Sequence, residues 1–131
     1  MNKNMKLFNE LSAKVFDSLI EVFPVEKEYR IEDFPEFDNA ENSEVFNSTF
    51  HFLENENYIK YQKQIPRCFV GVVLTSKGLS VLNASPPVLK NNETVSQSIK
   101  KALKSGSEEV ISDTMKKLFA FGTKYIIENL A

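Results

Sequence analysis

The 131-residue sequence has one cysteine, one histidine, four glycines and no tryptophan. Because Cys68 is alone, an internal disulfide is impossible. A nucleophile paired with a base, or a zinc site, needs more such side chains, and His51 and Cys68 fall on different expected elements. The four glycines stand singly, so the sequence lacks a glycine-rich loop that cradles phosphates. We therefore expect no enzymatic activity, no metal, no cofactor and no small-molecule substrate.

Long hydrophobic runs are also missing. The nearest candidate, residues 118–127, is shorter than the roughly 20 apolar residues that span a bilayer, and it includes Lys124. The first residues lack the charged, apolar and small-residue pattern of a secretory signal. We expect no integral membrane span and, with a single cysteine, a cytoplasmic location.

The composition is typical of one compact globular unit. Hydrophobic residues make up 42% of the chain and charged residues 26%. The length also fits a single domain, for which about 100–150 residues is usual. Eleven phenylalanines supply most of the aromatic side chains. We expect a core built mainly on phenylalanine, whose ring needs no hydrogen-bond partner.

Charge is distributed unevenly along the chain, although its net value is only −2. Residues 31–59 hold eight acidic side chains and no lysine or arginine, whereas residues 60–117 hold ten basic and four acidic ones. Lys100, Lys101 and Lys104 share one side of an expected helix. They are interpreted as a solvated face, with contact to phosphate or to an acidic partner, including residues 31–59 of a second copy, as the alternative.

Apolar residues recur at helical spacing in several segments. The expected helices cover residues 5–23, 31–38, 43–55, 76–83, 93–104 and 108–130. Pro24 ends the first helix, and Pro35 restricts the second to a short helix or turn. Thr75 supplies a cap for the fourth, and Pro86 and Pro87 separate it from the last two.

Two segments are rich in β-branched and aromatic residues and predict strands. They cover residues 58–62 and 68–74. A loop near Pro66 joins them as a hairpin. Asn57 precedes the first strand and tolerates the left-handed backbone that ends a helix.

Two short motifs around these strands resemble those of winged-helix domains. The sequence Leu53-Glu-Asn-Glu-Asn-Tyr-Ile59 is similar to the passage from the recognition helix into the first wing strand, with Asn57 at the usual glycine. Leu74-Thr-Ser-Lys-Gly78 is similar to the end of the second wing strand. The resemblance implies an α+β, mainly helical fold, with a winged-helix core in residues 1–85 and a C-terminal helical extension, 86–131, packed on the same core.

The resemblance implies DNA binding in some members and protein interaction in others. The expected recognition helix offers no positive charge, and it carries Glu44 and Glu54 beside Asn47 and His51. Phosphate attraction is therefore missing where DNA readers need it. We expect a protein-interaction or regulatory module. The alternative is a DNA-binding transcriptional regulator that uses its basic wing; the side chains available for this are Lys60, Lys63, Arg67 and Lys77.

The lysines of the wing also have a structural interpretation, because exposed lysines protect edge strands from pairing. His51, between two phenylalanines, is interpreted as a helical side chain rather than a general base. Cys68 is interpreted as a small hydrophobic residue of a strand rather than a reactive thiol.

The last expected helix has an apolar stripe wider than one neighbouring helix covers. We expect it to pack on the first helix and to use the rest of the stripe in a homodimer. The expected contact residues are Leu118, Phe119, Phe121, Gly122 and Tyr125. Gly122 suggests the close approach of another backbone, since a mid-helix glycine costs about 1 kcal/mol relative to alanine. The alternative is a monomer in which the core covers the whole stripe.

Overall fold

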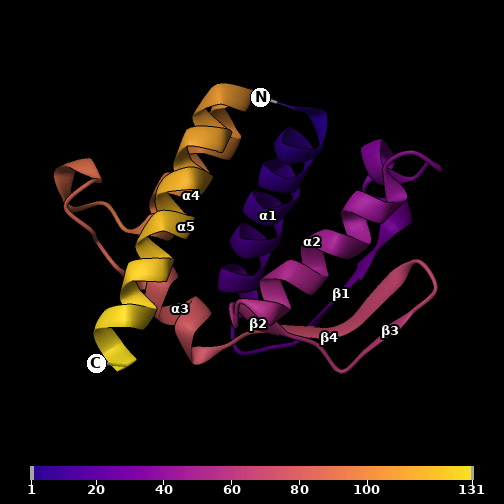
Figure 1. The fold of residues 1–131 in the computed structure, drawn as a ribbon, viewed down its shortest axis with the longest axis horizontal. Helices are drawn as coiled ribbons and strands as arrows, with labels where there is room; N and C mark the ends of the chain where they lie inside the picture. Colours follow the sequence, from indigo (N-terminus) through magenta and orange to yellow (C-terminus); the bar gives the residue numbers. More distant parts are fainter. Residues whose placement is uncertain (1, 131) are drawn as a thin grey trace.

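The computed structural model describes the backbone of residues 2–130 and the side chains of residues 2–124. The fold is α+β and mainly helical, as predicted (Figure 1). The helices are α1 (Lys3–Val22), α2 (Ser43–Asn55), α3 (Ser76–Asn83), α4 (Val95–Ser105) and α5 (Glu108–Leu130). The strands are β1 (Lys27–Arg30), β2 (Ile59–Lys60), β3 (Lys63–Ile65) and β4 (Cys68–Leu74). Among the described residues, no helix combines the length and the apolar character needed to cross a membrane.

The small antiparallel sheet is organised around β4. Strand β1 pairs with one side of β4, and β2 and β3 pair with the other side as the first arm of the predicted hairpin, with β4 as its returning arm. Opposite Phe69 lie Tyr29 of β1 and Gln64 of β3. Arg67, in the turn before β4, has a φ of 66°. The hairpin is therefore confirmed, although its first arm is divided into two short strands.

Two features of residues 24–38 differ from the sequence prediction. The strand β1 was not expected, because three of its four residues are charged. These three are exposed in the structure, and only Tyr29 is buried. The short helix or turn expected over residues 31–38 takes the form of two 3-10 turns, Ile31–Asp33 and Pro35–Phe37, rather than one continuous helix. Pro35 lacks the N–H that a continuous helix would need at this position.

Local capping explains where several helices begin and end. The Asn2 side chain accepts a hydrogen bond from the Met5 amide at the start of α1. Thr94 and Gln97 form a reciprocal capping box at the start of α4. Helix α2 is followed by Asn57 with a φ of 64°, which turns the chain into β2 as predicted.

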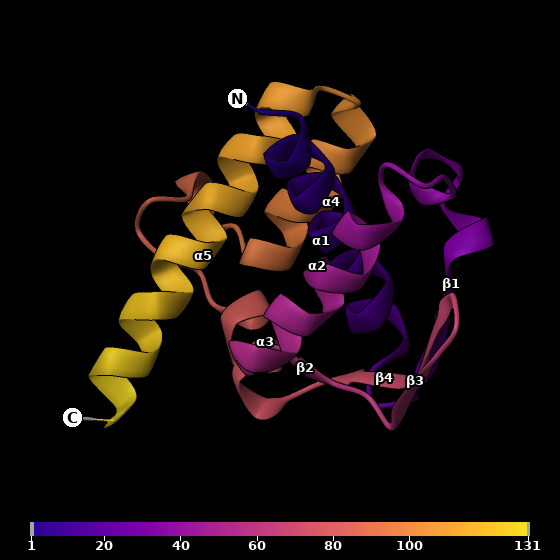
Figure 2. The same cartoon turned by 45° about the vertical axis from the view of Figure 1, so that its right-hand side comes forward.

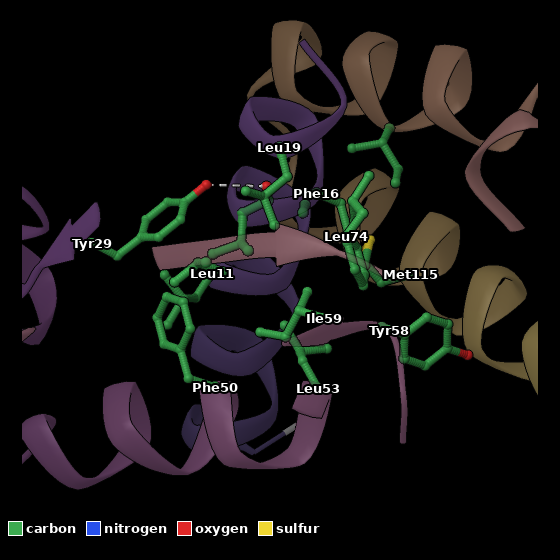
Figure 3. Close-up of a cluster of buried hydrophobic side chains, with 14 of the residues drawn as sticks. Leu11, Phe16, Leu19, Tyr29, Phe50, Leu53, Tyr58, Ile59, Leu74 and Met115 are labelled. Atoms are coloured by element: carbon green, nitrogen blue, oxygen red, sulfur yellow. Dashed lines mark hydrogen bonds between the residues drawn. The ribbon is translucent and has the colours of Figure 1, made fainter. Parts of the chain in front are cut away.

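The core lies between the sheet and helices α1 and α2. Figure 3 shows Leu11, Phe16 and Leu19 of α1 gathered with Phe50 and Leu53 of α2. All five are at most 1% exposed. Such burial of large apolar side chains is the main favourable term in folding.

Helices α4 and α5 pack on the other side of α1 (Figure 2). Ile99 of α4 and Met115 of α5 are buried in the same core as α1. The Lys6 ammonium meets the Glu108 carboxylate at 2.6 Å, joining the first turns of α1 and α5. The predicted packing of the last helix on the first is confirmed.

Candidate interaction surfaces

The β2–β4 hairpin and the start of α3 do not present all four basic side chains that the sequence suggested for nucleic acid. The Arg67 guanidinium lies 2.7 Å from a carboxylate oxygen of Asp38 and 3.7 Å from one of Glu32. These acids belong to the segment between β1 and α2, which folds back onto the turn between β3 and β4. Arg67 therefore has its charge balanced within the chain.

Lys77 is also engaged within the chain. Its ammonium donates to the backbone carbonyl of Glu56 at 2.7 Å and lies 4.3 Å from the centre of the Tyr58 ring. Burial lowers the pKa of Lys77, and the carboxylate of Glu56 partly opposes this. Cation–π contact of this kind is favourable. Lys77 thus joins the first turn of α3 to the end of α2.

Lys60 and Lys63 remain exposed on the short strands β2 and β3. Among the described residues neither forms an ion pair. They are paired through their backbones to Val73 and Val70 of β4. Two of the four expected phosphate-binding residues are therefore free to meet an anion.

The exposed surface of α2 carries acidic and polar side chains and no basic one, as predicted. Glu44, Ser48 and Asn55 are exposed on it. His51 has a ring nitrogen 2.8 Å from the side-chain oxygen of Gln64 on β3, and its ring meets Phe69 edge-on. His51 thus links α2 to strands β3 and β4.

Cys68 and the carboxylates give no geometry typical of a metal site or of a reactive thiol. Cys68 is 3% exposed, and burial raises the pKa of its thiol. Within the described part of the chain, no three His, Cys, Asp or Glu side chains are grouped so as to hold a metal ion.

The apolar stripe of α5 is largely taken up inside the chain. Leu118 is 2% exposed, and Phe119 packs against rings from α1, from α2 and from Tyr58, which precedes β2. Phe121 is half-buried against the core. The side chain of Tyr125 lies outside the described residues. The dimer stays a prediction, with four of its five residues, Leu118, Phe119, Phe121 and Gly122, already packed within the chain itself.

The reason for a glycine at position 122 differs from the one that the sequence suggested, the approach of another backbone. A Cβ atom added there would collide with the hydroxyl of Tyr58, which follows α2. Figure 3 shows the Tyr58 ring pointing toward the helix that carries Met115. The glycine makes room for a side chain of the same molecule rather than for the backbone of a second one.

The lysines of α4 also find partners inside the chain. Lys100 lies 3.0 Å from Asp17 and 2.8 Å from Glu21, both on α1. Lys101 lies 2.6 Å from Glu93. This supports the interpretation as a solvated, ion-paired face, with Lys104 exposed beyond it.

The structure has an apolar groove that the sequence did not indicate. It lies between the first half of α1 and the outer side of α2 and has a volume of about 570 Å³. Figures 1 and 2 show these two helices side by side. The residues lining this α1–α2 groove are Asn2, Asn4, Met5, Phe8, Glu44, Val45, Ser48, Thr49 and Phe52.

Aromatic rings and a methionine form the apolar part of the α1–α2 groove. Phe8 lies 5.3 Å from Phe52 and 5.4 Å from Phe119, measured between ring centres. Met5 is 48% exposed and Phe52 is 42% exposed. The one sequence signal was Phe52, an aromatic residue outside the buried stripe of α2. Its neighbours from α1 and α5 come together only in the fold.

Comparisons with protein-family models, curated proteins and solved structures found no match to this chain.

Proposed function

We propose that this chain is a non-enzymatic protein-interaction module on a winged-helix scaffold, and that a partner protein docks in the α1–α2 groove. The observation that carries the proposal is the exposure of Met5 and Phe52 beside Phe8 in one groove. Large apolar side chains gathered on a surface mark binding sites more often than chance. Methionine and aromatic residues are also enriched at the centres of protein interfaces.

The order of elements supports the winged-helix part of the proposal. Helix α2 runs directly into β2, and β3 and β4 form the hairpin expected of a wing. Helix α3 follows with Thr75 as its cap, at the second position of the second motif. The short second helix of the resemblance is replaced here by 3-10 turns, and this is the main departure.

Electrostatics favours a protein partner over DNA. Helix α2 has no basic residue and exposes Glu44, so it would repel the phosphates that flank a groove of DNA. Arg67, in the turn of the hairpin, and Lys77, on α3, are occupied by contacts within the chain. Only a small part of the expected attraction to phosphate remains.

DNA binding through the wing is the second candidate, and the exposure of Lys60 and Lys63 favours it. Such contacts to phosphate would position the protein without reading sequence. In this case affinity would be steeply dependent on salt, and the groove would have no part in it.

A titration with a fluorescent mixed-sequence DNA duplex at several salt concentrations separates the two functions. We expect affinity weaker than about 1 µM near physiological salt, as for non-specific contact. Sub-micromolar binding with a steep salt slope, weakened by changing Lys60, Lys63 and Arg67 to alanine, would replace the proposal by the DNA-binding one.

A photo-crosslinking side chain at position 52 tests the protein partner in cells that make this protein. The matched control carries the same group at Val88, which is 53% exposed and outside the groove. We expect a discrete crosslinked protein from position 52 that is missing from position 88. Equal patterns from both positions would contradict docking in the groove.

A further inference from the structure

We propose that the α1–α2 groove binds two turns of an amphipathic helix that carries a lysine or arginine at the end next to Glu44. This inference rests on the proposed function and specifies the chemistry of the partner. The alternative occupants are a helix without a basic residue at that end and a second copy of this chain, and the experiment distinguishes both from the proposed partner.

The two walls of the groove have the spacing that a third helix fits. Helix α1 contributes Met5 and Phe8, three residues apart, and α2 contributes Val45 and Phe52, seven apart, with Thr49 between them. Seven residues of helix rise about 10 Å, which is two turns. Side chains of a third helix at positions i, i+3 or i+4, and i+7 would fit between these rows.

The groove is lined by both apolar and polar side chains. Met5, Phe8 and Phe52 provide flexible and flat apolar surface, whereas Asn2 and Ser48 are exposed polar side chains. Specific interfaces usually combine apolar and polar contacts in this way. An extended peptide would instead need an open strand edge to satisfy its backbone, and both walls here are helices.

The charge of the groove sets the charge of its partner. Glu44 is the only charged residue that lines it, it is exposed, and among the described residues it forms no ion pair. Lys3, on the adjacent turn of α1, is neutralised by Glu41 at 2.7 Å. The free carboxylate at the start of α2 therefore attracts a cation, and a lysine or arginine on the docked helix supplies it.

Glu44 also lies in the first turn of α2, where a negative charge interacts favourably with the helix dipole. That role concerns stability and would exist without a partner. A charge-reversal pair distinguishes the two roles, because the dipole does not depend on the sequence of a docked helix.

The test is selection from a displayed library of helical hairpins in which one exposed face is randomised. Helices that bind the immobilised full chain are expected to carry apolar residues at i, i+3 or i+4, and i+7, with lysine or arginine at one end. Enriched helices without that basic residue, or no enriched helices at all, would overturn the inference.

Affinity of one selected hairpin is then measured against four variants. We expect Phe52→Ser and Glu44→Lys to weaken binding at least about tenfold, and Glu44→Gln about three- to fivefold. The control is Glu26→Lys, an exposed acidic position beyond the other end of α1, which should change affinity less than about twofold. Thermal unfolding of each variant shows whether it is folded.

A hairpin with its basic residue changed to glutamate should recover affinity for Glu44→Lys, and failure of this exchange would overturn the charge assignment. Self-association that is lost in Phe52→Ser would identify a second copy as the occupant and would also overturn the inference. A crosslinked partner at position 52 with no selection of basic helices would overturn it while leaving the proposed function intact.

Discussion

Helix α2 contributes phenylalanines to two aromatic clusters that differ in burial. In the sealed cluster, Phe46 and Phe50 pack on Phe69, with ring centres 4.4 Å apart for Phe50 and Phe69, and all three are 0% exposed. In the open cluster, Phe52 packs on Phe8 and Phe119 but stays 42% exposed.

The chemistry of the rings is the same, so the difference lies in what covers them. The sealed cluster has the sheet below it and the 3-10 turns beside it, so its apolar area is removed from water on folding. The open cluster keeps apolar surface in contact with water, and only the binding of another molecule can bury that surface. We infer that the first cluster mainly stabilises the fold and that the second serves binding.

The largest effect is expected from the sealed cluster. Phe50→Ala removes a fully buried ring and leaves a cavity, which should lower the free energy of unfolding by about 3–5 kcal/mol. Urea titration followed by circular dichroism measures this. An equal loss in Phe52→Ala would erase the distinction between the clusters.

A smaller change in the free energy of unfolding is expected at Gly122, where α5 closes one side of the open cluster. In an exposed helix, Gly122→Ala would stabilise by about 1 kcal/mol. Here the added methyl group collides with the Tyr58 hydroxyl, so we expect destabilisation of about 1–3 kcal/mol. Thermal unfolding checks the sign.

The matched control is the double variant Gly122→Ala with Tyr58→Phe, which deletes the hydroxyl. It should recover most of the loss, as a coupling between two residues in contact. Additive effects of the two changes would show that Gly122 has another role.

Phe52→Ala should cost only about 1 kcal/mol, since the ring is partly exposed and its main contacts are edge-on to Phe8 and Phe119. The same urea titration gives the value. A loss above that of Phe50→Ala would mean that the open cluster is needed chiefly for folding.

The smallest effect is a loss of stability in alkaline solution that is caused by the ionisation of Tyr58. The Tyr58 ring contacts Phe16 of the buried core and Phe119 of the open cluster. Burial, and then the charge of Glu56, raises the pKa of Tyr58 to about 12. An unfolded tyrosine ionises near pH 10, before the folded one. Stability from this group is therefore complete below about pH 10 and is lost as the pH rises toward 12.

Urea titrations at pH 8 and pH 10.5 measure this fall, which should be less than about 1 kcal/mol from Tyr58. Tyr58→Phe cannot ionise and should fall less than the parent chain. An identical fall in both proteins would assign the effect to the other tyrosines.

Much of the fold followed from periodicity and capping, because those signals are local. Asn57 and Thr75 flank the predicted hairpin in the sequence, and they flank the β2–β4 hairpin in the fold. Strand β1 was missed because its pairing with β4 is long-range and only Tyr29 shows burial. Short edge strands carry little signal of their own.

The candidate site could be predicted less well than the fold. Its walls come from Met5 and Phe8 on one helix and Phe52 on another, about forty residues apart in the sequence. The basic residues of the wing were visible in the sequence, but the ion pair of Arg67 with Asp38 depends on the return of a distant segment. Surfaces of this kind are defined by tertiary packing.

The most direct test of the central claim is a map of amide chemical-shift changes when a selected amphipathic hairpin is added to the isotope-labelled chain. We expect changes concentrated at residues 2–8, at the start of α1, and at residues 44–52 of α2, with little change at Lys60 and Lys63. Changes centred on the wing or on α4, with the α1–α2 groove unaffected, would contradict it.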